Sequence, residues 1–357
     1  MKLRKRLRRI PEALLVLLAS YSIPFLSRRA ICSLSRLLGR CFYKFDGRHR
    51  RIGLANLNIA FGDSISPERK HDILRAMFRS QALTLLDLLW FRRKTKARLR
   101  NWVVCDASFD MVFDVPSAVL VTAHLSNWEV ISLTCGLRGG RFTSIYMEQK
   151  NRFVTKLLND LRTKTGSKIV KREGGLRALL KSMKEGRGTG LLLDQNTLPY
   201  EGGVFVPFFG VPAPVSNISG VFVERVNAKL YMVWCTADDQ GRYQLFAKDP
   251  YPDGMPMGAD RKDITAHLTL ELESIIRQNP DFWTWGYKRW RFCREEDDKS
   301  LFPFYVESYE SYIRYIQLVQ NYQKAKAALD AVNEEERLKR IQRKKERRRK
   351  KRGDESQ

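Results

Sequence analysis

The sequence lacks the signatures of several common protein classes. No uninterrupted apolar run reaches the roughly 18 residues that a membrane-spanning helix needs, so a polytopic membrane protein is excluded. The six cysteines form no CxxC or other close pair, which argues against a zinc site or a disulfide framework and favours buried thiols in a reducing compartment. There is also no GxSxG, HExxH, P-loop or dinucleotide GxGxxG motif. We therefore expect neither a metal nor a nucleotide cofactor.

Positive charge, by contrast, is abundant and unevenly placed. The chain carries 65 Lys and Arg against 39 Asp and Glu, a net charge of +26. Residues 337–352 contribute a net +11 and residues 2–9 a further +6, which leaves +9 elsewhere. Such charge indicates an acidic partner, such as an anionic membrane, an acidic carrier protein or nucleic acid. Because no aromatic residue interrupts the C-terminal run to stack on bases, an anionic membrane surface is favoured over RNA. Alternatively, the C-terminal basic run is a solvated helical extension that binds no partner.

The N-terminus combines a basic start with a short apolar segment. Residues 13–27 are uncharged, contain Pro24 and are followed at once by Arg28 and Arg29. This run is short for a membrane span, and arginines beside it can reach lipid phosphates. We therefore expect residues 1–30 to form a membrane-associated segment on the cytoplasmic face of an inner membrane, peripheral or anchored by a single helix.

The middle of the chain alternates between strand and helix patterns, with strands that are apolar on both faces. This alternation predicts an α/β fold with a central sheet, mostly parallel or mixed, flanked by helices. The expected strands are residues 118–123, 142–147, 168–170, 190–193, 204–208, 230–235 and 243–246. The expected helices are residues 66–91, 128–137, 153–161, 176–183 and 264–276. We assign residues 31–300 to one catalytic domain. Residues 301–357 form a helical extension with a basic tail, beginning with an apolar stripe of Tyr309, Tyr312, Ile316 and Val319.

The residues that point most directly to chemistry are HLSNWE, from His124 to Glu129. His124 follows a buried strand and precedes a helix that Ser126 or Asn127 can cap, which places it where open α/β sheets bind ligands. His124 and Glu129 can meet only if His124 curls back from the loop over the first helical turn, because residues five apart on one helix diverge by about 140°. A carboxylate-oriented imidazole can remove a proton from a hydroxyl. A structural histidine is the alternative.

Several motifs together resemble the bacterial lipid A biosynthesis acyltransferase family, the late lauroyl and myristoyl group related to lysophospholipid acyltransferases. They are HLSNWE, LLLDQN at 191–196, GGVFVPFFGVPAPV at 202–215, WTWGYKRWRF at 283–292 and RRIGLANLNIAFGDSISPERK at 50–70. The resemblance covers about residues 10–295 and implies a glycerolipid-acyltransferase-like fold. In one departure, Ser126 replaces the glycine usual in the family's histidine motif, which puts backbone contacts there in question.

The resemblance implies roles for particular residues. His124 would be the general base, Glu129 its partner and Asp194 a further acid needed for activity, although Asp194 could equally cap a loop. A basic residue between the motifs is expected to bind substrate, with Arg162, Lys164, Lys171 and Arg172 left as candidates. Further expected substrate-binding residues are Asn127, Trp128, Gln195 and Arg289, the last through a phosphate. For Phe205 and Phe208 we favour core packing over an acyl-chain wall.

The resulting hypothesis is an O-acyltransferase in lipopolysaccharide biosynthesis at a Gram-negative inner membrane. The acyl chain would pass from an acyl carrier protein thioester to a hydroxyl of a lipid A precursor or related membrane glycolipid, with no cofactor beyond this co-substrate. Within acyl transfer, the alternative is acyl-CoA as donor and a lysophospholipid, aminolipid or other glycolipid as acceptor. Outside enzymes, the alternative is a membrane-surface RNA-binding or scaffold protein on an acyltransferase fold.

Overall fold

The computed structural model describes residues 17–146, 152–171, 174–324, 327 and 334. By its internal contacts the chain divides into two units. The first comprises Met1–Arg291 with Asp298–Tyr305, and the second comprises Phe292–Asp297 with Val306–Gln357. The basic runs at residues 2–9 and 337–352 lie outside the described residues.

The first unit is built around a seven-stranded sheet with the order β1-β9-β8-β2-β5-β3-β4. Its strands are β1 (Val103–Cys105), β2 (Val119–Thr122), β3 (Phe142–Tyr146), β4 (Lys168–Lys171), β5 (Gly188–Leu192), β8 (Leu230–Ala237) and β9 (Tyr243–Lys248). All neighbouring strands are parallel except β8 and β9, so the expected mostly parallel α/β sheet is confirmed. A separate hairpin joins β6 (Gly203–Phe208) to β7 (Val211–Ser216).

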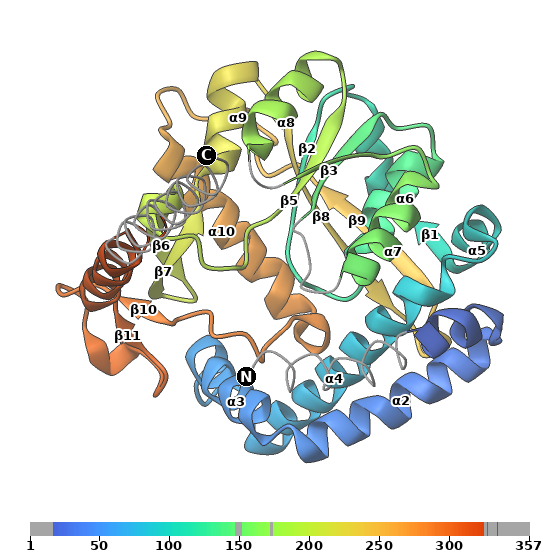
Figure 1. The fold of residues 1–357 in the computed structure, drawn as a ribbon, viewed down its shortest axis with the longest axis horizontal. Coiled ribbons are helices and arrows are strands. Elements are labelled where there is room, and N and C mark those ends of the chain that lie inside the picture. Colours follow the sequence, from blue (N-terminus) through green and yellow to red (C-terminus); the bar gives the residue numbers. More distant parts are fainter. Residues whose placement is uncertain (1–16, 147–151, 172–173, 325–326, 328–333, 335–357) are drawn as a thin grey trace, which may run out of the picture. The chain divides into compact units, whose positions relative to one another are not determined.

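Helices cover both faces of this sheet (Figure 1). They are α2 (Arg28–Phe45), α3 (Gly47–Phe61), α4 (Pro67–Trp90), α5 (Thr95–Trp102), α6 (Glu129–Leu137), α7 (Arg152–Thr163), α8 (Gly175–Lys184), α9 (Ile218–Val226) and α10 (Arg261–Gln278). The core between α6 and the sheet includes Leu120, Ile131, Phe142 and Val233, while α8, α9 and α10 lie against the opposite face. Every strand and helix expected in this region is present, and α2, α3, α5, α9, β1 and β7 are additional.

Local chemistry explains the helix boundaries. The Ser66 side chain accepts a hydrogen bond from the backbone N–H of Arg69 and Pro67 occupies the first helical position, so the predicted start of α4 is confirmed. Ser27 caps α2 in the same way, through the N–H of Ala30.

The expected terminal helices are confirmed only in part. Residues 17–22 are helical and Ile23–Phe25 form a 3-10 turn, while residues 13–16 lie outside the described part. Within the described part, none of the helices combines the length and the hydropathy needed to cross a bilayer. In the second unit, residues 309–324 are helical, as the apolar stripe there predicts. It also contains the short parallel pair β10 (Phe292–Cys293) and β11 (Glu307–Ser308).

Candidate active site

A histidine and an aspartate meet where two neighbouring parallel strands end. β2 and β5 pair with Thr122 opposite Leu192, and His124 and Asp194 each follow two residues later. His124 Nδ1 lies 2.8 Å from Asp194 Oδ1, and the His124 backbone N–H donates to Asp194 Oδ2 at 2.9 Å. The parallel register therefore brings together two residues that are 70 positions apart.

The surroundings of Asp194 keep its carboxyl group charged. Its side chain is buried, and the Trp283 indole Nε1–H donates to Oδ2 at 2.9 Å. Burial by itself raises the pKa of Asp194, but the charge and hydrogen bonds of His124, together with Trp283, outweigh it and lower the pKa below its usual value. Because a charged carboxylate only accepts hydrogen bonds, we assign the imidazole proton to Nδ1, which leaves Nε2 as the acceptor.

The second imidazole nitrogen of His124, Nε2, faces Gln195 in a partly exposed position. The His124 side chain is 18% exposed, and the Gln195 amide Nε2 lies 3.3 Å from His124 Nε2. Trp128 packs edge-on against the imidazole with ring centroids 4.5 Å apart. Burial lowers the pKa of His124, but the charge and hydrogen bond of Asp194 raise it further, so the net pKa lies above the ordinary imidazole value. The nitrogen that can take a proton is thus more basic than usual, and it belongs to a partly exposed imidazole.

Glu129 occupies a different place from the one expected. Both of its carboxylate oxygens accept hydrogen bonds from Arg162, one of them at 2.9 Å to Nε, while the imidazole of His124 is held by Asp194. The expectation that Glu129 orients His124 is therefore corrected, because the neighbouring strand supplies the nearer carboxylate. Glu129 acts on His124 only through its charge, which contributes to the raised pKa.

The backbone between His124 and Glu129 is held by a segment that follows α10. Leu125 forms an antiparallel bridge with Trp283, the Ser126 N–H donates to the Phe282 carbonyl at 2.9 Å, and the Thr284 hydroxyl donates to the His124 carbonyl at 2.9 Å. Ser126 adopts a φ of +51°, a left-handed conformation that glycine adopts without strain. The glycine that the resemblance implies at this position would adopt the same backbone conformation without the strain that Ser126 carries.

The expected capping of α6 by Ser126 or Asn127 is wrong. Trp128 is the residue before the helix, and no side chain caps its N-terminus. The Asn127 side chain instead points inward, where its Nδ2 donates to the Tyr243 hydroxyl at 3.3 Å, so the expected contact of Asn127 with substrate is replaced by a buried one.

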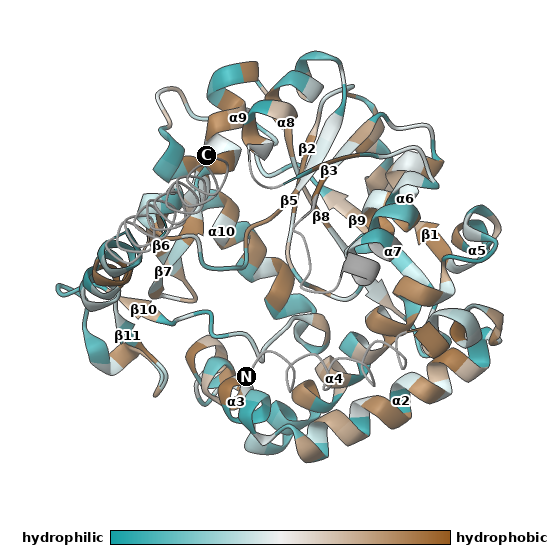
Figure 2. Cartoon of the chain, viewed as in Figure 1, coloured by the Kyte–Doolittle hydropathy of each residue, from teal (hydrophilic) through white to brown (hydrophobic). Residues whose placement is uncertain are grey.

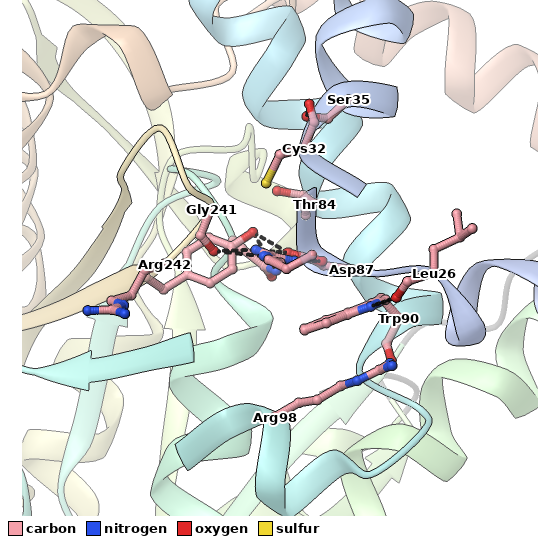
Figure 3. Close-up of polar contacts among 12 residues, drawn as sticks. Leu26, Cys32, Ser35, Thr84, Asp87, Trp90, Arg98, Gly241 and Arg242 are labelled. Atoms are coloured by element: carbon pink, nitrogen blue, oxygen red, sulfur yellow. Dashed lines mark hydrogen bonds and ion pairs between the residues drawn. The ribbon is translucent and has the colours of Figure 1, made fainter. Parts of the chain in front are cut away.

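Asn127 ends a buried polar network that joins the first helices to the histidine loop. Figure 3 shows the part of this network around Asp87 and Gly241. The Tyr243 hydroxyl donates to Asp87 Oδ2 at 2.6 Å, and Arg28 donates to both Asp87 oxygens and to the Gly241 carbonyl. Burial lowers the pKa of Arg28, but the Asp87 carboxylate raises it further, so the guanidinium stays charged. Nothing in the sequence pattern signals this network, because its members come from four distant segments.

The four basic residues expected as substrate-binding candidates lie in different surroundings. Arg162 pairs with Glu129 beside the histidine loop, whereas Lys164 is exposed and donates to the Arg92 carbonyl at 2.6 Å. Lys171 ends β4, and Arg172 lies outside the described residues.

Arg289 is fully buried, with Nη1 donating to Asn196 Oδ1 at 2.5 Å and to the Pro214 carbonyl at 3.0 Å. Burial lowers the pKa of Arg289 to about 10. We expected Arg289 to contact a substrate phosphate, but solvent does not reach its side chain. Its hydrogen bonds instead support the loop that carries Asp194. The bulky neighbours Trp283, Trp285, Trp290 and Phe208 are core residues, which confirms the interpretation of Phe208.

Two cavities lie between α6 and the sheet. A cavity of about 80 Å³ is bordered by Trp128, Glu129 and Arg162, and its remaining lining is mostly apolar. A second cavity of about 330 Å³ lies towards the opposite ends of the strands. Leu120 and Phe142 line both, so these two side chains separate an apolar space near His124 from a larger one beyond it. Within the described residues, no three His, Cys, Asp or Glu side chains come together as metal ligands would.

A partly exposed imidazole held by a buried carboxylate, at the strand ends of an α/β sheet, has the geometry that general-base chemistry requires. The bacterial lipid A biosynthesis acyltransferase family matches residues 1–292, and the chain belongs to that family. It is therefore an O-acyltransferase.

Two curated relatives are similar over most of their length. Lipid A biosynthesis acyltransferase 2 of Shigella flexneri is 21% identical over 74% of this chain and 85% of its own. The lipid A biosynthesis myristoyltransferase of Escherichia coli (strain K12) is 22% identical over 70% of this chain and 78% of its own.

Proposed function

We propose that this enzyme transfers a fatty acyl chain from an acyl carrier protein thioester to a hydroxyl of a lipid A precursor at the cytoplasmic face of the inner membrane. The lipid A acceptor is supported by the family and by the names of both relatives. The carrier protein as donor is supported by the basic charge of the chain, because acidic and basic surfaces attract each other.

The observation that carries the mechanism is the bond between His124 Nδ1 and Asp194. While the Nδ1–H group of His124 donates a hydrogen bond to the Asp194 carboxylate, His124 Nε2 takes the proton from the acceptor hydroxyl, and the oxygen forms an ester bond with the thioester carbonyl carbon. The carbon–sulfur bond then breaks, and the leaving thiolate takes the proton back from the imidazolium. Every proton and bond is accounted for without a covalent enzyme intermediate.

Charge develops on the carbonyl oxygen during this attack. At the start of α6, the N–H groups of Val130 and Ile131 donate to the Asn127 and Trp128 carbonyls at 3.2 and 3.3 Å. The Glu129 N–H, at the first helical position directly after the loop that carries His124, is our proposed backbone donor to the oxyanion. The Glu129–Arg162 pair borders the adjacent cavity, where we place the start of the acyl chain.

The test is transfer from acyl carrier protein to a lipid A precursor by the purified full chain. His124→Gln is expected to lower turnover by about 10²- to 10⁴-fold, the usual contribution of a general base. The matched control is His49→Gln, which changes an exposed histidine on α3 and is expected to keep turnover. Near-normal turnover of the His124 variant would contradict the mechanism, and transfer from acyl-CoA alone would contradict the donor.

A further inference from the structure

Four arginines surround a groove between α2 and α4. Arg36 and Arg40 of α2 face Arg75 and Arg79 of α4, and together with Gly39, Tyr43 and Ala76 they line a space of about 510 Å³. A Cβ added at Gly39 would lie 2.7 Å from the Arg79 Cα, so the glycine permits the close approach of the two helices. The small floor residues leave the four guanidinium groups around a shared concave surface.

The positive charge of this groove is only partly neutralised. Arg75 pairs with Asp72 at 2.6 Å and Arg79 with Asp239 at 2.9 Å, and both carboxylates are well exposed to solvent. Arg36 donates to the Ser33 hydroxyl at 3.0 Å. Within the described part of the chain, the Arg40 side chain has no hydrogen-bond or ion-pair partner. The groove therefore keeps an excess of cationic donors directed at a common space.

Apolar side chains are exposed on the same surface element. Leu37 and Phe45 of α2 are 56% and 77% exposed, and α2 carries five basic residues and no acidic one. Leu37 lies about 60° around the helix from Arg40. Figure 2 shows polar and apolar residues alternating along α2. The preceding residues add further exposed apolar side chains, namely Leu18, Tyr21 and Phe25.

We propose that this groove, formed by Arg36, Arg40, Arg75 and Arg79, binds the phosphate of an anionic phospholipid headgroup. Guanidinium groups match phosphate oxygens in geometry and charge. A bilayer is favoured over a soluble acidic protein because basic groups beside exposed apolar side chains are the pattern of helices that lie in a membrane surface. The inference rests on the membrane-surface part of the proposed function and is independent of the acyl-transfer chemistry.

The test measures binding of the full chain to vesicles of phosphatidylcholine with phosphatidylglycerol. The groove variant is Arg40→Gln/Arg75→Gln, which removes one exposed cation from each helix. A matched variant, Arg29→Gln/Lys44→Gln, removes two exposed cations of α2 that do not line the groove. A second control, Arg177→Gln/Lys181→Gln, removes two exposed cations of α8.

Vesicle binding at high salt distinguishes direct contacts in the groove from diffuse electrostatic attraction. At about 1 M salt the Debye length is about 3 Å, so charges that do not touch the lipid contribute little. The groove variant is then expected to bind more weakly than the unmodified chain, because its two missing arginines would touch the phosphate; at physiological salt the expected loss is about 30-fold. At high salt, both control variants are expected to bind as the unmodified chain does, with folding of all variants checked by circular dichroism.

Three outcomes would overturn the proposal. Equal losses in the groove variant and the α2 control would show that the attraction is diffuse. Binding of inorganic phosphate that the groove variant loses, with vesicle binding of that variant unchanged, would assign the groove to a free phosphate. Unchanged vesicle binding with weakened binding to acyl carrier protein would assign it to an acidic protein. Vesicle binding and acyl transfer are separate measurements, so failure of the groove is distinguishable from failure of the proposed function.

Discussion

Replacing Asp194 by Asn tests the geometry of the site most selectively. Asp194 Oδ2 accepts hydrogen bonds from the His124 backbone N–H and from Trp283, both at 2.9 Å, so the Asn oxygen is expected to keep that side. The Asn NH₂ group would then face His124 Nδ1 and donate to it. This moves the imidazole proton to Nε2, the nitrogen that must accept a proton from the acceptor hydroxyl.

The expected loss of turnover is about 10³- to 10⁴-fold, the magnitude associated with a wrong histidine tautomer. Acyl transfer from the carrier thioester would be followed across a pH series. The base form of His124 grows as the pH rises through its pKa, which lies above 6.5 in the unmodified chain. Removing the carboxylate charge lowers that pKa, so the acidic limb of the residual activity is expected to move to lower pH.

Glu129→Gln is the control, because it removes a carboxylate that bonds Arg162 and not the imidazole. It is expected to leave the tautomer unchanged and to shift the acidic limb less than Asn at position 194 does. The reasoning would be refuted if Asp194→Asn kept turnover within tenfold of the unmodified enzyme. It would also be refuted if Glu129→Gln produced the larger shift in the pH profile.

The remaining predictions concern stability and chain length. Asp87→Ala leaves the buried Arg28 without its carboxylate and is expected to cost about 3–5 kcal/mol of unfolding free energy, measured by denaturant unfolding. Ser126→Gly relieves a left-handed φ of +51° and is expected to stabilise the chain by about 1 kcal/mol, seen as a raised Tm. Phe142→Ala joins the two cavities beside α6 and is expected to shift transfer towards longer acyl chains, measured by mass spectrometry of products from mixed donors.

Each of these predictions has a contradicting result. The control Asp110→Ala removes an exposed partner of Arg138 and is expected to cost at most about 1 kcal/mol of unfolding free energy. If Asp87→Ala cost no more than this control, the stabilising role of the buried Arg28–Asp87 pair would be contradicted. A lowered Tm for Ser126→Gly would show that the hydroxymethyl group stabilises the loop. An unchanged product profile for Phe142→Ala would place the acyl chain elsewhere.

Local sequence patterns predicted the architecture well and the partnership within the site less well. The apolar strands ending near His124 and Asp194 are visible in the sequence, and both residues were expected at strand ends. The pattern does not reveal that β2 and β5 are neighbours, which is what brings Asp194 to the imidazole. Glu129 was favoured as the partner because it is near in sequence, although the helix start directs it towards Arg162.

Other features depend on contacts between distant segments and leave no local signal. Arg162 was one of four basic candidates, and only the fold of α7 against α6 places it on Glu129. The aromatic and basic alternation around Arg289 suggested a phosphate contact, whereas the hydrogen bonds of this residue lie in the core. The departure from glycine at Ser126 was visible, but its meaning, a positive φ, required the backbone.

Mass spectrometry of total lipid A, from cells that carry either the unmodified chain or His124→Ala, tests the central claim most directly. The account predicts that the variant strain lacks one secondary acyl chain, whose mass also reports the length of the chain transferred. Lipid A of identical mass in both strains, with the variant folded and present at normal levels, would contradict it.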